Sequence, residues 1–175
     1  AVIIAGMGRY GQIVGRVLAR GTRAAIDAGR RVGVAWLAGA CGECDQCRDD
    51  RENLCRRATF TGWDRDGGFA THALADARFV HPLPDDVVAA DVAPLLCGGA
   101  IGFRSLKVSG IRPGQRLGLF GFGASATIVA QIARHRGCEV FVATRSRREQ
   151  ERALALGAVW AGSYDDEVPA PLHAA

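Results

Sequence analysis

The sequence lacks several features that mark particular classes of protein. No apolar run approaches the roughly 18 to 20 residues that span a bilayer, and residues 1–6 have neither the basic start nor the long apolar core of a signal peptide. Six cysteines in 175 residues are too few for a disulfide scaffold. The net charge is only +4, without a dominant basic tract. We therefore expect a cytoplasmic protein that needs neither a membrane nor a nucleic acid as partner.

Glycine, in contrast, is abundant, with 23 residues in a chain that is 49% apolar and 23% charged. Short apolar runs bounded by glycines in the first half predict strands of a β domain over residues 1–90. The second half, residues 91–175, alternates differently: an apolar run at 117–120, a helical pattern at 127–136, an apolar run at 140–143, a helix at 146–156 and a short strand at 158–161. Strand, helix, strand order predicts parallel strands joined by a right-handed crossover, and hence an α/β fold.

Four cysteines form the most specific motif. Cys41, Cys44, Cys47 and Cys55 are spaced C-x2-C-x2-C-x7-C within a polar segment, residues 41–55. Four thiolates satisfy a tetrahedral zinc ion and leave no open position, so the motif predicts a structural zinc site. An iron–sulfur cluster remains an alternative, although it usually has a shorter last gap followed by proline. Disulfides and a redox pair are further alternatives.

A second motif, G-x-G-x-x-A, follows the predicted strand at 117–120 and opens a helix. Here the first glycine permits a sharp turn, the second lets a pyrophosphate approach the backbone, and the small third residue lets helix and strand pack closely. An ordinary strand-to-helix turn is the alternative. The candidate dinucleotide contacts are Gly121, Phe122, Gly123, Ala124, Ser125 and Ala126.

The end of the next strand bears on the choice between NAD and NADP. An acidic residue there would bind the ribose hydroxyls of NAD, but this chain has Thr144, Arg145 and Ser146, followed by two more arginines. These residues favour NADP, because their hydroxyl and guanidinium groups could bind a 2′-phosphate. Alternatively, the arginines only decorate the start of a solvated helix, and NAD remains possible.

Four segments in a fixed order resemble the zinc-dependent alcohol dehydrogenases of the medium-chain dehydrogenase/reductase family: RVGVAWLAGACGECDQCRDDRENLC, TGWDRDGGFATHALAD, APLLCGGAIGFRSL and GLFGFGASATIVAQIA. The resemblance implies a GroES-like catalytic domain over 1–90 with a structural zinc loop at 41–55, followed by a Rossmann NAD(P)-binding domain over 91–175, each truncated. It also implies hydride transfer between an alcohol or aldehyde and NAD(P), and an intact parent that is a homo-oligomer.

The same resemblance implies a second, catalytic zinc ion. Cys97 would be one of its ligands, as the surrounding PLLCGG favours, with a small buried hydrophobe as the alternative for an isolated cysteine. Trp36 resembles an aromatic wall of the substrate pocket, with a core position as the alternative. The family's first cysteine ligand would precede Ala1, and its histidine aligns with Gly11, which cannot bind metal. We therefore expect an inactive fragment of a longer enzyme that binds about one zinc ion.

Two other functions compete. The segment at Gly6, Gly8 and Gly11 reads G-x-G-x-x-G, with helix-like apolar spacing after it, and is similar to the start of nucleotide-binding regulatory domains of potassium transport. It suggests a noncatalytic nucleotide sensor. A zinc-binding interaction module without turnover is the other possibility.

Overall fold

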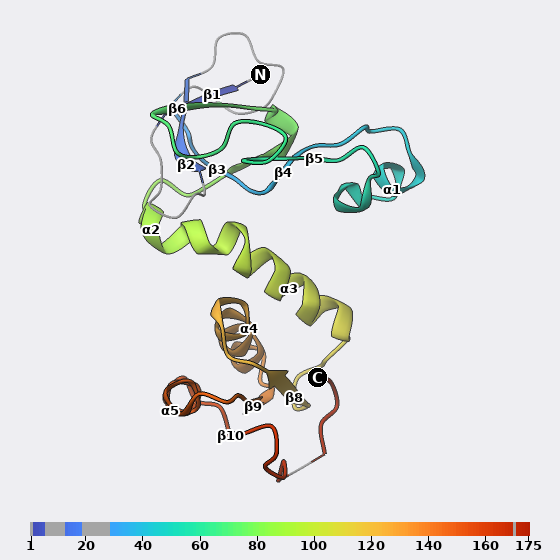
Figure 1. Cartoon of the computed structure of the whole chain (residues 1–175), viewed down its shortest axis with the longest axis vertical. Helices are drawn as coiled ribbons and strands as arrows, with labels where there is room; N and C mark the ends of the chain where they lie inside the picture. Colours follow the sequence, from blue (N-terminus) through green and yellow to red (C-terminus); the bar gives the residue numbers. More distant parts are fainter. Residues whose placement is uncertain (1, 6–12, 19–28, 170) are drawn as a thin grey trace. The chain divides into compact units, whose positions relative to one another are not determined.

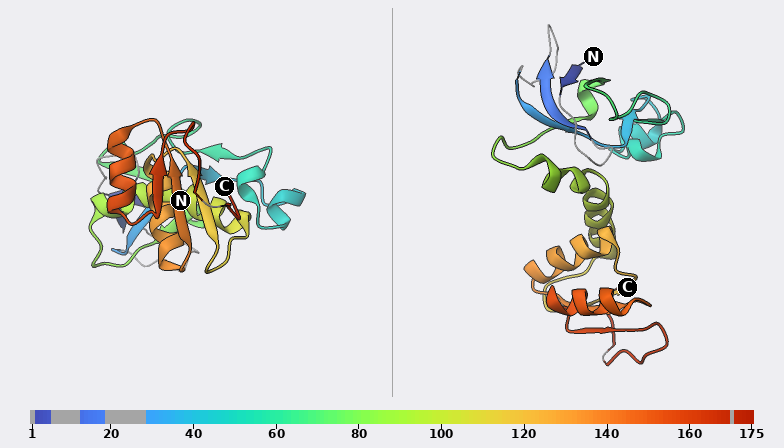
Figure 2. Two further views of the ribbon diagram at one scale, coloured as in Figure 1. Left: turned by 90° about the horizontal axis from the view of Figure 1, so that it is seen from below. Right: turned by 60° about the vertical axis from the view of Figure 1, so that its left-hand side comes forward.

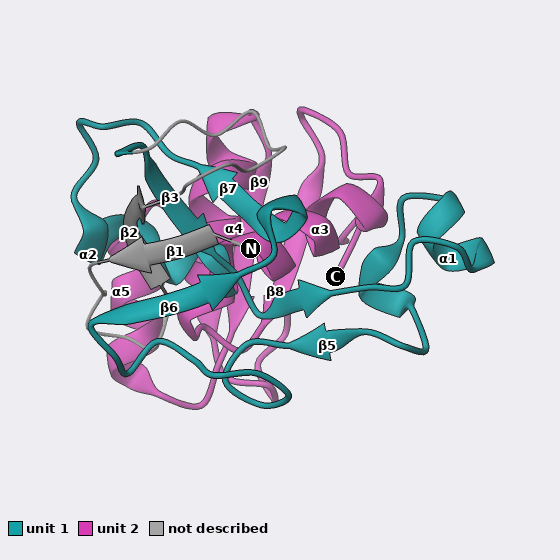
Figure 3. Cartoon of the chain, turned by 90° about the horizontal axis from the view of Figure 1, so that it is seen from above, with its two compact units in different colours: residues 1–97 teal, residues 98–175 magenta. Residues whose placement is uncertain are grey.

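The computed structural model describes residues 2–5, 13–18, 29–169 and 171–175. The chain divides into two compact units, Ala1–Cys97 (unit 1) and Gly98–Ala175 (unit 2), which Figure 3 colours separately. The boundary expected after residue 90 falls inside α2 (Ala89–Val92), shortly before this division. The α/β class is confirmed, with a β-rich first unit and a parallel sheet in the second.

Unit 1 is built on a five-stranded sheet in which all neighbours are antiparallel. Its order is β6-β1-β2-β3-β7, and Figure 1 labels β6, β1, β2 and β3. These strands are β1 (Val2–Ala5), β2 (Ile13–Leu18), β3 (Arg31–Val34), β6 (His72–Ala75) and β7 (Val80–Pro82). The side chains of Val32, Val34 and Val80 are buried. Because these apolar residues lie on adjacent strands, their burial fixes how β3 and β7 pair.

A smaller sheet joins β4 (Leu37–Gly39) to β5 (Thr59–Phe60), and the segment between them carries the cysteines. The apolar run at 32–37 does not form one strand, because it divides at residues 35–36 between β3 and β4. The remaining elements of unit 1 are short helical turns: α1 (Asp45–Arg48), η1 (Glu52–Leu54), η2 (Ala77–Phe79), α2 and η3 (Ala93–Leu96).

The nucleotide-sensor alternative is not supported by unit 1. It required a helix after the first glycine motif, whereas β2 is a strand that pairs antiparallel with β1. The glycines of that motif, Gly6, Gly8 and Gly11, lie outside the described residues. Two successive antiparallel strands are incompatible with the strand, turn and helix that place a pyrophosphate at a helix N-terminus.

Unit 2 contains the predicted strand, helix, strand order. Its sheet has the order β10-β9-β8 with parallel neighbours, formed by β8 (Arg116–Phe120), β9 (Glu139–Ala143) and β10 (Trp160–Gly162). Helices α4 (Ala124–His135) and α5 (Arg147–Ala155) connect successive strands (Figure 2). Val140 and Val142 of β9 are fully buried, together with Ala133 of α4 and Ala153 of α5. The central strand is therefore apolar on both faces, as in a covered parallel sheet.

A further helix, α3 (Gly98–Ser109), was not predicted, because Gly98, Gly99 and Gly102 lower its intrinsic helix propensity. The structure explains the glycines by close packing on α4. A Cβ at Gly102 would lie 2.8 Å from Cγ2 of Val129 and 3.2 Å from the carbonyl oxygen of Ser125. None of the helices in the described part of the chain is long and apolar enough to cross a membrane.

The end of the chain adds to the other edge of β8. Ala174 bridges Leu117 in parallel, and its carbonyl oxygen accepts a hydrogen bond of 2.7 Å from the backbone N–H of Gly118. The chain thus runs from β8 through β9 to β10 on one side, and then returns to the opposite side of β8. Such a reversal is a topological switch point, and ligands of open α/β sheets bind at the carboxyl ends of the strands there.

Candidate functional site

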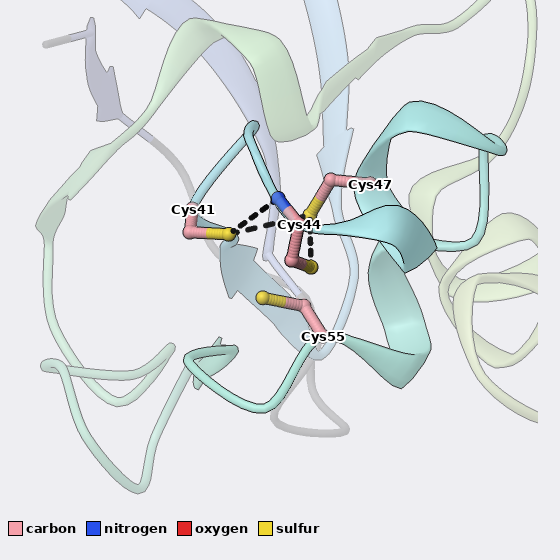
Figure 4. A group of neighbouring side chains, drawn as sticks. All are labelled: Cys41, Cys44, Cys47 and Cys55. Atoms are coloured by element: carbon pink, nitrogen blue, oxygen red, sulfur yellow. Dashed lines mark hydrogen bonds between the residues drawn. The ribbon is translucent and has the colours of Figure 1, made fainter.

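The four clustered cysteines converge although they come from different local elements. Cys41 follows β4, Cys44 is the N-cap of α1, Cys47 lies within α1, and Cys55 follows η1. All four sulfur atoms lie within 4.8 Å of one another, and Figure 4 shows them pointing toward one space. Within the described ranges, no other group of three or more such side chains could hold a metal ion. The structure therefore provides one complete set of metal ligands.

The spacing of the sulfur atoms fits a single tetrahedral ion. The Sγ atoms of Cys44 and Cys47 are 3.6 Å apart, and those of Cys41 and Cys47 are 3.8 Å apart. A tetrahedron with zinc–sulfur bonds of about 2.3 Å has edges of about 3.8 Å. Disulfide sulfurs would be about 2.05 Å apart, and all the cysteines are free. In an iron–sulfur cluster, thiolates bind different irons and need not converge on one point.

Local hydrogen bonds prepare one of the sulfurs for a metal. The backbone N–H groups of Glu43 and Cys44 lower the pKa of Cys41 to about 5, and the N–H of Cys44 lies 3.4 Å from the Cys41 sulfur. The guanidinium of Arg57 pairs with Glu43 and also faces Cys41, which raises the pKa of Arg57. Burial acts in the opposite direction on Cys47 and raises its pKa to about 12. Without a metal, Cys41 is thus a thiolate at neutral pH and Cys47 a thiol.

The glycine turn of unit 2 lies at the carboxyl end of β8, beside the switch point. Gly121 has φ +91°, a conformation that favours glycine, and its N–H donates to the carbonyl oxygen of Ala143 on β9 at 2.7 Å. Gly123 is the N-cap of α4 and is exposed, with no atom within 4 Å of the position a Cβ would occupy. A ligand can therefore approach the backbone at Gly123 closely.

The other predicted contacts of this turn have different surroundings. Ala124 is exposed, and Ser125 is half-buried near Gly98. Ala126 packs against the core of unit 2, as the small third position of the motif requires. Phe122 is only 2% exposed, so its side chain belongs to the core and only its backbone is available to a cofactor.

The three residues predicted after β9 also differ from one another. Thr144 is buried, and its carbonyl oxygen accepts a hydrogen bond of 2.7 Å from Gln150. Ser146 is the N-cap of α5, where its hydroxyl accepts from the backbone N–H of Glu149 at 3.4 Å. Arg145 is exposed. Of the three, Thr144 is thus buried, whereas Arg145 and Ser146 are open to solvent.

Cys97 and Trp36 do not join the cysteine cluster. Cys97 is exposed at the C-cap of η3, and in the described part of the chain no set of three metal-ligating side chains includes it. Trp36 is 58% exposed and its ring lies 4.5 Å from that of Phe60, between centroids. Their predicted roles, metal ligand and pocket wall, stay predictions. Arg152, which belongs to no sequence motif and was not predicted, also contacts the glycine turn through the carbonyl oxygen of Phe122.

The fold and the two candidate sites together define a class of protein: a β unit with a four-cysteine metal site, followed by a parallel α/β unit with a glycine turn after its first strand. Residues 7–85 match the alcohol dehydrogenase GroES-like domain. The chain is 46% identical over 170 residues to the probable alcohol dehydrogenase AdhA of Mycobacterium tuberculosis. The match covers 94% of this chain and 49% of that protein.

Solved structures agree on the fold. The CAD of Helicobacter pylori, complexed with NADP(H), matches with a TM-score of 0.82 and 24% identity over 93% of this chain and 56% of that chain. The cobalt- and zinc-bound alcohol dehydrogenase of Pyrobaculum aerophilum matches with a TM-score of 0.77 and 20% identity over 93% of this chain and 57% of that chain.

The chain belongs to the zinc-dependent alcohol dehydrogenases of the medium-chain dehydrogenase/reductase family. It spans about half the length of the curated relatives it matches.

Proposed function

We propose that this chain is the zinc-bearing and nucleotide-binding part of an NADP- or NAD-dependent alcohol dehydrogenase, which interconverts alcohols and aldehydes by hydride transfer. The observation that carries the proposal is the convergence of four cysteine sulfurs within 4.8 Å, in the unit that matches the alcohol dehydrogenase GroES-like domain. The intact enzyme would act on small-molecule alcohols or aldehydes as a homo-oligomer.

Cys41, Cys44, Cys47 and Cys55 would hold a structural zinc ion. Four thiolates fill its coordination sphere, so the ion would order the loop rather than bind substrate. A metal ion would stabilise this loop, which has little apolar packing of its own, because Cys47 and Cys55 are the only buried residues between positions 41 and 57. Arg57, already paired toward Cys41, would offset part of the negative charge of the thiolates.

The glycine turn would bind the pyrophosphate of the dinucleotide. The N–H groups of Gly123, Ala124 and Ser125 lie at the N-terminus of α4, where the helix dipole favours negative charge. The exposed guanidinium of Arg145 would receive the 2′-phosphate of NADP. The likeness to a structure complexed with NADP(H) supports this preference, with NAD as the second possibility.

Cys97 would be one thiolate ligand of a catalytic zinc ion in the intact enzyme. That ion would supply Lewis-acid chemistry, which lowers the pKa of a bound alcohol. Trp36, largely exposed, would form one wall of the substrate pocket. Because no described set of three ligands includes Cys97, we expect this chain alone to bind one zinc ion and to show negligible alcohol oxidation.

Three measurements on the purified chain test this function. Elemental analysis should give about one zinc ion per chain, and titration should show NADPH binding, detected by its fluorescence. Benzyl alcohol with NADP should give no turnover. Absence of zinc together with absence of NADPH and NADH binding would refute the proposal, whereas two tightly bound zinc ions or measurable turnover would refute the incomplete catalytic site.

A further inference from the structure

Arg152 of α5 contacts the glycine turn through several independent interactions. Its Nη2 donates to the carbonyl oxygen of Phe122 and to the hydroxyl of Thr127, each at 2.8 Å. Its guanidinium also lies 5.1 Å from the centroid of the buried Phe122 ring. Glu149 holds the same guanidinium from the side, with its Oε2 2.9 Å from Nε. Helix α5 is thereby tied to the turn that precedes α4.

These contacts fix the direction of two backbone N–H groups. In a trans peptide, the carbonyl and the following N–H point in opposite directions. Arg152 holds the carbonyl of Phe122, so the N–H of Gly123 must point away from Arg152. The carbonyl oxygen of Gly123 accepts two hydrogen bonds, one of 2.9 Å from the backbone N–H of Thr127 and one of 2.8 Å from the Thr127 hydroxyl, which itself accepts from Arg152. The first turn of α4 and Arg152 together therefore keep the N–H of Ala124 pointing away in the same manner.

The two N–H groups therefore face the open side of the turn. Gly123 and Ala124 are exposed, and the space beside Gly123 is empty to 4 Å. Adjacent N–H groups at the start of a helix form a favourable site for phosphate oxygens. Arg152 itself acts from behind this site, because Glu149 neutralises its charge and its polar groups are engaged with the turn.

Only arginine provides this arrangement. One planar guanidinium serves the Phe122 carbonyl, the Thr127 hydroxyl and the Glu149 carboxylate at the same time, while stacking on an aromatic ring. A lysine ammonium is a compact point charge on a flexible stem and has neither the fork nor the planar face. Lysine would retain the ion pair with Glu149 but would not hold the turn in the same way.

We propose that Arg152 is a positioning residue that orients the backbone N–H groups of Gly123 and Ala124 toward the pyrophosphate of a bound dinucleotide. This inference rests on the proposed function, because it assumes that the turn binds a dinucleotide. It assigns the preorganisation of the phosphate site to a side chain on α5, outside the glycine motif. Hydrogen bonds that are already aligned before binding raise affinity because less ordering remains to be done.

The test compares NADPH with a ligand that lacks the pyrophosphate, adenosine 2′-monophosphate. Arg152→Met should weaken NADPH binding by about tenfold, as expected for the loss of a charged hydrogen bond, and Arg152→Lys should recover only part of it. Thr127→Val, which removes the hydroxyl but keeps the shape, should weaken NADPH binding to a smaller extent. Adenosine 2′-monophosphate should bind all variants within about twofold, because it does not use the turn.

Arg136→Met is the matched control. Arg136 also lies over an aromatic ring, that of Phe103 at 5.3 Å, but at the far end of α4. This variant should bind NADPH as the unsubstituted chain does. Thermal unfolding of each variant identifies any general loss of structure, which would weaken both ligands together.

The outcomes separate the two proposals. If the unsubstituted chain binds NADPH and Arg152→Met binds it equally well, Arg152 has no positioning role and the proposed function stands. Equal weakening of NADPH and adenosine 2′-monophosphate would also refute the positioning role. If the unsubstituted chain binds neither NADPH nor NADH, the proposed function itself fails, and the role of Arg152 fails with it.

Discussion

Replacement of Cys47 by serine tests the metal centre most directly. Its Sγ atom lies 3.6 Å from that of Cys44 and 3.8 Å from that of Cys41, distances that match the edges of a tetrahedron around one zinc ion. Cys47→Ser leaves three thiolates and a hydroxyl, which is not a zinc ligand of structural sites. Removing even an outer hydrogen-bond partner of a ligand costs about 10- to 100-fold in metal affinity, so loss of a ligand should cost more than about 100-fold.

The same substitution should loosen the loop that carries the cysteines. Because only Cys47 and Cys55 are buried between positions 41 and 57, little else holds that segment. Zinc binding and folding are coupled in sites of this kind. Limited proteolysis should therefore cut this loop in Cys47→Ser at the rate seen for the chelator-treated, unsubstituted chain.

The assay combines elemental analysis with competition by a chromophoric chelator. Cys138→Ser is the matched control, because Cys138 is also buried, its sulfur donates to the carbonyl oxygen of Arg112 at 3.4 Å, and no described metal-ligand set includes it. That variant should keep one zinc ion. Retention of a tightly bound zinc ion by Cys47→Ser, or loss of zinc from Cys138→Ser to the same extent, would refute four-thiolate coordination.

Three further predictions concern the nucleotide turn and the metal-free cluster. Arg145→Ala should weaken NADPH binding by about tenfold and leave NADH binding unchanged, with Arg136→Met as the neutral control; equal effects on both dinucleotides would contradict a 2′-phosphate contact. Gly121→Val should destabilise the chain by about 1–2 kcal/mol in urea denaturation because φ is +91°, whereas Gly123→Ala should keep stability but weaken NADPH binding. In the folded, metal-free chain the pKa of Cys41 is lowered from 9.0 to about 5, so between pH 5 and pH 9 the unfolded chain binds more protons than the folded chain. The contribution of Cys41 to the stability of the metal-free chain should thus grow from pH 5 to 9 and be lost as the pH falls through 5, and Cys41→Ala should remove this contribution.

Part of this protein could be predicted from its sequence because the determining interactions are local. The cysteines lie within fifteen residues, and two-residue gaps bring successive sulfurs to one side of a turn, so spacing alone indicated a shared ion. The order of strand, glycine turn, helix and strand in unit 2 was equally readable. Each of its elements carries its own periodicity and its own terminal residue, such as Gly157 after α5.

Other features depend on contacts between segments that are distant in the sequence. Helix α3 contains three glycines and carries no helix signal, and its packing on α4 at Gly102 overrides propensity. The motif at Gly121 to Ala126 could not reveal that the Phe122 side chain is buried and available only through its backbone.

The sequence by itself determined which residue types were available for zinc and phosphate, and their order along the chain. Only the tertiary structure decided which surfaces are open to a ligand. It placed the returning segment at Ala174 beside β8, which creates the switch point, and it set Arg152 behind the turn. The physical reason is that sheet order and side-chain direction are set by burial and pairing across the whole unit, which no local pattern records.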